Sequence, residues 1–260
     1  MSKRKAQSVR KPQKYSSNFF RIIPFRVYSM VLITVFGVVI YSNSFDCSFH
    51  LDDFRNITEN QTIRDLDNPK DITTFSYHSA MRIVGFLTFA LNYHFNGLNV
   101  LGYHAVNLLI HIGASLFAWW LAFLILSTPV MRRFDIAQRR NLVALACGLL
   151  FVAHPVQTQA ITYSVQHFAS LAPLFYLASL CFYLKARLTA DKARKILYFI
   201  CFLGAVLAGM FTKEITFTLS LAVLFLEFAF VSTDNLQGLL KKKVVLYGIL
   251  LFGLFAIMVT

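Results

Sequence analysis

The sequence predicts an all-α, polytopic membrane protein, because it is rich in apolar residues and groups them in long stretches. Of the 260 residues, 57% are hydrophobic and 14% are charged, and the mean hydropathy is +0.59. Soluble globular domains carry considerably more charge. Since a helix needs roughly 20 apolar residues to cross a bilayer, the apolar stretches are interpreted as transmembrane helices.

About seven stretches are expected to cross the membrane. Several are shorter than the usual span, which tilting and flanking aromatic residues can accommodate. They are Phe25–Tyr41, Val100–Leu126, Leu142–Ala153, Phe168–Leu184, Ile196–Phe211, Ile215–Val231 and Val244–Thr260. The 13 residues Ile83–Phe95 are too few to span, so we expect an interfacial helix there, within a long first outer loop at 42–99.

The basic residues orient these helices. With the N-terminus inside, the inner segments hold 20 of the 25 Lys and Arg residues, whereas a spanning helix at 83–95 would leave only nine inside. The first arrangement follows the positive-inside rule and explains the net charge of +13 without nucleic-acid binding. We therefore expect residues 1–24 to form a basic cytoplasmic tail that precedes an uncleaved signal anchor.

This orientation places three short polar elements on the outer face. One is the aspartate pair Asp52 and Asp53 in "FHLDDFRNITEN", and the others are "HPVQTQ" at 154–159 and "TKE" at 212–214. The aspartates are consistent with a solvated loop or a helix cap. The apolar residues around them instead favour partial burial, which would raise a carboxylate pKa toward that of a useful base.

The other two elements also have structural alternatives. Lys213 and Glu214 interrupt an apolar stretch, so they are either functional or a helical-hairpin turn with a self-satisfied ion pair. His154 is followed by a proline that would end a helix.

A polar stripe on one predicted helix is formed by His104, Asn107 and His111, at positions i, i+3 and i+7. Haem or metal ligation is one reading, but we favour hydrogen bonding between helices and predict neither a metal nor a cofactor. Two glycosylation sequons begin at Asn56 and Asn60 in the outer loop, and we interpret them as coincidental.

Four stretches occur together in a familiar order: "FHLDDFRNI", "FLTFALNYHFNGLNVLGYHAVNLLIH", "FVAHPVQTQAITYSVQHFASLAPLFYLASLCFYLKAR" and "GMFTKEITFTLSLAVLFLEF". Over about residues 27–230 the chain resembles the N-terminal membrane half of the transmembrane O-mannosyltransferase family with tetratricopeptide repeats, particularly its bacterial members. The resemblance implies a lipid-linked glycosyltransferase of the GT-C class.

Such an enzyme takes a sugar, here a mannose-like one, from a polyprenyl-phosphate donor and places it on a Ser or Thr hydroxyl of an exported acceptor protein. The resemblance implies a bacterial plasma membrane location with the catalytic loops on the periplasmic face. It assigns the catalytic base to an outer-loop aspartate, and the pattern leaves Asp52 and Asp53 both open. The residues expected to meet the lipid phosphate or the sugar are Lys213, Glu214, His154, Arg82 and Gln157.

The chain stops at Thr260 within an apolar run and carries no tetratricopeptide repeats. We therefore expect the membrane domain at 25–260 to be truncated, or to be completed by a partner chain. A different class of function is a noncatalytic membrane module that assembles with such a partner. A transporter that uses the polar stripe on 104–111 is a further alternative, but we find no convincing inverted repeat.

Overall fold

The computed structural model describes residues 24–66 and 82–232, and within these ranges it is helical and contains no strand, which confirms the all-α class. Its α-helices are α1 (Phe25–Ile40), α3 (Ile83–Asn96), α4 (Val100–Ile125), α5 (Arg140–Val152), α6 (Thr158–Thr162), α7 (His167–Leu188), α8 (Lys192–Met210) and α9 (Leu219–Leu226). A 3-10 turn at Glu214–Thr218 precedes α9, and a π-helical turn at Glu227–Val231 continues it. Shorter turns cover Ser42–Asp46, Phe54–Thr58 and Gln61–Ile63.

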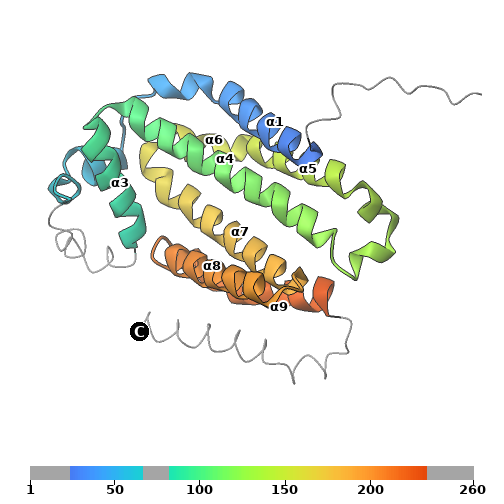
Figure 1. Ribbon diagram of the computed structural model, residues 1–260. Coiled ribbons are helices and arrows are strands. Elements are labelled where there is room, and N and C mark those ends of the chain that lie inside the picture. Colours follow the sequence, from blue (N-terminus) through green and yellow to red (C-terminus); the bar gives the residue numbers. More distant parts are fainter. Residues whose placement is uncertain (1–23, 67–81, 233–260) are drawn as a thin grey trace, which may run out of the picture.

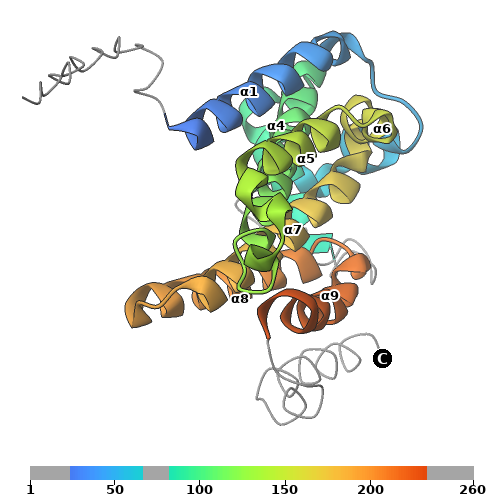
Figure 2. The same cartoon turned by 90° about the vertical axis from the view of Figure 1, so that its right-hand side faces the viewer.

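The helices form a bundle around α4 and α7 (Figures 1 and 2). Helices α1, α4 and α5 pack on one another, and α8 and α9 lie on the opposite side of α7. Gly148 of α5 allows the close approach to α1 and α4, because a Cβ there would collide with Ile33 and Trp119. The bundle is thus held by contacts between helices that are not all adjacent in the sequence.

Four helical segments of the described chain are long and apolar enough to cross a membrane, and a bent pair would make a fifth. The four are Val100–Ile125, Ser164–Leu188, Lys192–Met210 and Glu214–Val231. Helix α1 is apolar but has only 16 residues. The predicted count of seven spans is therefore not confirmed, and the seventh, Val244–Thr260, lies outside the described residues, as does nearly all of the predicted basic tail.

The bent pair replaces the predicted span Leu142–Ala153. Helix α5 ends at Val152, and after a break the segment Pro155–Thr162 continues at an angle of 44° to it. Proline has no N–H to donate, so the hydrogen-bond ladder of α5 stops where the sequence predicted. A helix is also found at the predicted position 83–95, as the 14-residue α3; its predicted place at the membrane interface stays a prediction.

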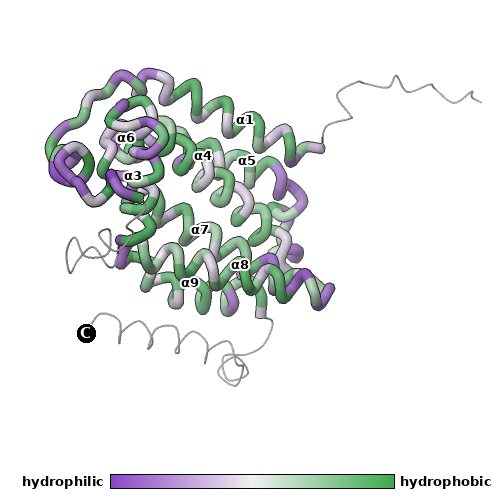
Figure 3. Tube along the Cα trace, turned by 60° about the vertical axis from the view of Figure 1, so that its left-hand side comes forward, coloured by the Kyte–Doolittle hydropathy of each residue, from purple (hydrophilic) through white to green (hydrophobic). Residues whose placement is uncertain are grey.

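Polar residues concentrate at the two ends of the bundle, with apolar helix between them (Figure 3). One end carries the loop 41–66, α3 and α6, and the opposite end carries the α4–α5 and α7–α8 connections. Of the 14 Lys and Arg residues in the described part of the chain, four lie at the first end. They are Arg55, Arg64, Arg82 and Lys213. We call this end the loop end and the other, with the remaining ten, the basic end.

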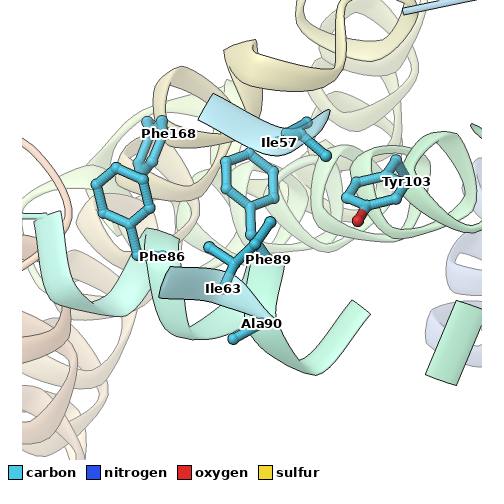
Figure 4. Close-up of a cluster of buried hydrophobic side chains, with 7 residues drawn as sticks. All are labelled: Ile57, Ile63, Phe86, Phe89, Ala90, Tyr103 and Phe168. Carbon is cyan, nitrogen blue, oxygen red and sulfur yellow. The ribbon is translucent and has the colours of Figure 1, made fainter. Parts of the chain in front are cut away.

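A separate hydrophobic cluster fixes the loop and α3 to the bundle (Figure 4). Its members come from the loop, α3, α4 and α7: Ile57, Ile63, Phe86, Phe89, Ala90, Tyr103 and Phe168. Ile57 and Ile63 are fully buried. At Gly85 the ring of Phe168 occupies the space that a Cβ would need, so α3 approaches α7 more closely than another residue would permit. The loop is therefore a packed part of the structure.

Candidate active site

The two aspartates of the loop 41–66 have different surroundings. Leu51, the residue before them, is 77% exposed and has a positive φ of 51°, the left-handed conformation that a leucine rarely adopts. The chain then turns so that Asp52 is exposed while Asp53 is fully buried. The burial expected from the flanking apolar residues therefore holds for Asp53 and not for Asp52.

Both carboxylate oxygens of Asp53 accept backbone hydrogen bonds. One accepts the N–H of Val165 at 2.7 Å, and the other accepts the N–H of His50 at 3.2 Å. Burial raises the pKa of Asp53 above its ordinary value, and the two hydrogen bonds and the nearby rings of His50 and His104 partly oppose that increase. Asp53 is neither a solvated loop residue nor a side-chain cap of the following turn. It makes no side-chain cap bond and instead joins the loop 41–66 to the turn that precedes α7.

Asp52 lies against Tyr163, which precedes α7. The hydroxyl of Tyr163 accepts the backbone N–H of Asp52 at 2.9 Å, and the Tyr163 ring stacks on His50 with centroids 5.0 Å apart. The pKa of Tyr163 is raised by burial, and the charges of Asp52 and Asp53 add to that increase, although the Asp52 N–H bond opposes it. Tyr163 thus fixes the Asp52 backbone while the Asp52 side chain remains exposed.

Two histidines, His104 and His167, connect the loop and the neighbouring helices. The ring nitrogens of His104 lie 2.9 Å from the carbonyl oxygens of Cys47 and Ile161, so this buried side chain connects α4 to the loop and to α6. His167 of α7 bonds Asn107 of α4 at 2.8 Å and Thr88 of α3 at 2.5 Å. These contacts hold three helices and the loop in one arrangement.

The third residue of the polar stripe, His111, bonds the carbonyl oxygen of Val152 at 3.1 Å, where α5 ends. Hydrogen bonding was the favoured interpretation of His104, Asn107 and His111, and the structure confirms it for all three. Within the described ranges, no group of three or more His, Cys, Asp or Glu side chains is placed to hold a metal ion.

A second polar group at the loop end consists of Arg82, at the start of α3, and Glu214, after α8. Their charged groups are 3.6 Å apart, and both side chains are about half exposed. The neighbouring backbones are also joined, since Val84 donates to the carbonyl oxygen of Phe211 at 3.1 Å. The interpretation of Lys213 and Glu214 as a self-satisfied pair is wrong, because Glu214 pairs with Arg82. Lys213 is half-buried beside them.

The remaining predicted residues lie on the α5–α6 connection. His154 is exposed and its Nδ1 accepts the N–H of Val156 at 3.3 Å, and Gln157 is partly exposed at the end of the same turn. Among the described residues, no hydrogen bond or ion pair joins His154 or Lys213 to either aspartate. All seven predicted residues lie at the loop end. Asp52 and Asp53 are neighbours in the sequence, and Arg82 and Glu214 form an ion pair.

The sequence reasoning missed Tyr163, His50 and His167. Tyr163 and His167 lie inside the stretch "AITYSVQHFAS", a mixed polar and apolar segment just before a predicted span. Polar aromatic residues at a helix start were an available signal. Their partners, however, are far away in the sequence.

The fold and the site together define an integral membrane protein of the helical class, with an acidic loop packed over one end of its helix bundle. Curated relatives include the protein O-mannosyl-transferase Tmtc3 of Drosophila melanogaster, 29% identical over 70% of this chain and 22% of its own length. The human protein O-mannosyl-transferase TMTC4 is 28% identical over 72% of this chain and 27% of its own length. Tmtc1 of Drosophila melanogaster is 30% identical over 65% of this chain and 19% of its own length.

These relatives are named protein O-mannosyl-transferases, so the chain is similar to the family that its ordered motifs resemble. The chain spans between about a fifth and a quarter of the length of the relatives just named. No family model matches the sequence. No solved structure matches it either.

Proposed function

We propose that the chain forms the membrane part of a glycosyltransferase of the GT-C class, in which Asp52 is the general base. It would transfer a mannose-like sugar from a polyprenyl-phosphate donor to a Ser or Thr hydroxyl of an exported protein. The names of the relatives support a transferase that acts on proteins. The donor, the base and the location are inferences from the resemblance and the site.

The observation that carries the proposal is the different environment of the two aspartates. A general base must come within hydrogen-bonding reach of the proton that it removes, so the carboxylate must be accessible to the substrate whatever its pKa. Asp53 is fully buried and both of its oxygens already accept backbone N–H groups. Asp52 is exposed, and Tyr163 holds its backbone. We therefore assign catalysis to Asp52 and the positioning of the loop to Asp53.

In the proposed reaction, the Asp52 carboxylate takes the proton of the acceptor hydroxyl as the hydroxyl oxygen attacks the anomeric carbon. The bond from that carbon to the phosphate oxygen breaks, and the lipid phosphate leaves with the bonding electron pair. A single displacement of this kind inverts the anomeric configuration. General base catalysis contributes about 10²- to 10⁴-fold to such a step.

The leaving phosphate gains negative charge, which a nearby cation would stabilise. Lys213 is our candidate, because Arg82 already has Glu214 as a partner. His154 and Gln157 lie on the turn that leads into α6, and in this proposal they contact the sugar or the acceptor. In this proposal Glu214 positions Arg82.

The proposed orientation puts the loop end on the periplasmic side of a bacterial plasma membrane and the basic end in the cytoplasm. Four Lys and Arg residues at the loop end against ten at the basic end support it. Single cysteines in a cysteine-free background test it. Val156→Cys should react with an impermeant maleimide from outside and Phe134→Cys only after lysis, since both side chains are exposed. The reverse pattern would refute the orientation.

The transfer itself is tested with membranes that contain the full chain, a polyprenyl-phosphate-mannose donor and a Ser/Thr acceptor peptide. We expect mannosylated peptide with an inverted anomeric configuration, and its loss in Asp52→Asn with normal membrane insertion. Asp46→Asn is the matched control, because Asp46 is another exposed acid of the same loop. No transfer by the wild-type chain, or transfer unaffected by Asp52→Asn, would favour the noncatalytic module.

A further inference from the structure

A cavity at the basic end, opposite the aspartates, has no part in the proposed transfer. It has a volume of about 390 Å³ and lies between α1 and α4. Its walls include Arg26 and Met30 of α1, and Gly113, Leu116, Trp120 and Phe123 of α4. The volume is in the range of about 300–1,000 Å³ that ligand sites occupy. Met30 is 43% exposed, so the cavity is accessible from the side of the bundle.

The cavity is charged at one end and apolar along its length. At the end where α1 begins and α4 finishes, the guanidinium of Arg26 lies 4.4 Å from the centroid of the Phe123 ring. The guanidinium of Arg140, at the start of α5, lies 5.4 Å from the same centroid. The two cations are therefore within about 10 Å of each other, close to a Debye length at physiological salt. Among the described residues, neither forms an ion pair with a carboxylate.

The length of the cavity matches half of a bilayer. Gly113 and Phe123 are ten residues apart on α4, a distance of about 15 Å along the helix axis. The hydrocarbon core of a membrane is about 30 Å thick. Because Phe123 lies near the end of α4, a cavity on a membrane-spanning α4 would reach from the membrane surface to about the middle of the bilayer, as an acyl chain of one leaflet does.

We propose that this cavity binds one anionic glycerophospholipid of the leaflet at the basic end. Its phosphate would lie between Arg26 and Arg140, relieving the repulsion of the two cations. One of its acyl chains would lie along α4 against Leu116 and Trp120. Two basic residues beside an anionic headgroup together strengthen its binding by at least about tenfold. Residues 1–23 contain seven basic and no acidic residues, so their charge does not suit this cavity.

The test is native mass spectrometry of the purified full chain, titrated with dioleoyl phosphatidylglycerol or dioleoyl phosphatidylcholine. We expect one phosphatidylglycerol to bind at least about tenfold more tightly than phosphatidylcholine, with Arg26→Gln/Arg140→Gln reducing this preference to about twofold or less. The matched control is Arg132→Gln/Arg133→Gln, which removes two exposed charges from the same end. It should leave the preference unchanged.

Two further arms separate a cavity from a charged surface. Met30→Trp would fill the apolar part and should weaken the binding of both lipids, and glycerol phosphate, which has no acyl chains, should not compete. Unchanged melting temperatures would show that the variants are folded. Equal binding of the two lipids, equal losses in both double variants, full competition by glycerol phosphate, or unaltered binding to Met30→Trp would each overturn the proposal.

Discussion

The carboxylate of Asp53 accepts the backbone N–H of Val165 at 2.7 Å, across 112 positions of sequence. Because the other oxygen of the same carboxylate accepts the N–H of His50, one buried side chain connects the loop 41–66 to the start of α7. Asp52 is the residue before Asp53, and its backbone N–H is bound by the hydroxyl of Tyr163, two residues before Val165. The position of the exposed carboxylate thus depends on the buried one.

Removing the Asp53 carboxylate should destabilise the loop end. Asp53→Ala would leave two N–H groups without an acceptor, and a buried unsatisfied group costs about 1–3 kcal/mol. We expect a loss of about 2 kcal/mol or more in unfolding free energy, measured by denaturant titration in detergent. Asp46→Ala, at an exposed position, should change it by less than about 0.5 kcal/mol. Similar losses in both variants would contradict the role of Asp53.

The titration of Asp53 should be visible in the pH dependence of stability. Burial raises the pKa of Asp53 in the folded state above the ordinary value of 3.8. In the pH window between the unfolded-state pKa and the raised folded-state pKa, the folded chain retains a proton that the unfolded chain has released. The contribution of Asp53 to stability therefore falls as pH rises from about 4 through the raised pKa. The melting temperature of the wild type relative to Asp53→Asn should be highest at the acidic end of the window. A difference that grows with pH would indicate a lowered pKa.

Tyr163→Phe should reduce sugar transfer more than it reduces stability. The substitution keeps the stacking on His50 and removes the hydroxyl that accepts the Asp52 N–H, a hydrogen bond worth about 1 kcal/mol. We expect transfer to fall by about fivefold with a melting temperature close to that of the wild type. Tyr176→Phe is the control, because the Tyr176 hydroxyl contacts Thr218 instead. Equal effects of the two substitutions on transfer would argue against a positioning role for Tyr163.

The buried ion pair at the basic end should contribute more to the free energy of unfolding than the exposed ion pair at the loop end. Glu227 is buried, accepts two hydrogen bonds from Arg187 at 2.6 and 2.9 Å, and accepts a third from Tyr183 at 2.8 Å. Breaking such a pair costs about 3–5 kcal/mol because a charge is left without its partner.

Glu227→Gln should therefore unfold at a clearly lower denaturant concentration than the wild type. Glu214→Gln removes one partner of an exposed pair, which contributes about 0–1 kcal/mol. Comparable shifts of the two unfolding midpoints would show that the link between α7 and the turn after α9 does not stabilise the fold.

Much of the fold could be predicted from the sequence because its signals are local. The long apolar stretches of the sequence indicated where helices lie, and the 13-residue apolar stretch at 83–95 correctly predicted a short helix. Proline located the end of α5, and the spacing of His104, Asn107 and His111 indicated hydrogen bonding between elements.

Contacts between distant segments could not be predicted in the same way. Nothing near Asp53 in the sequence indicates the N–H of Val165, and nothing near Glu214 indicates Arg82. The choice between the aspartates depended on the burial and hydrogen bonds of Asp53, which the residues next to it in the sequence do not indicate. The position of the acidic loop could be predicted from the sequence. Which of its two aspartates is buried and which is exposed depends on how the loop packs against the helices.

The most direct test of the division of roles compares Asp52→Asn with Asp53→Asn. The transfer rate would be measured in membranes and normalised to the amount of folded chain. We predict that Asp52→Asn lowers the normalised rate by about 10²- to 10⁴-fold at unchanged stability, because the base is lost. Asp53→Asn should lose stability and retain a larger normalised rate. An Asp52→Asn chain that transfers sugar normally, with transfer abolished in a stable Asp53→Asn chain, would contradict the assignment.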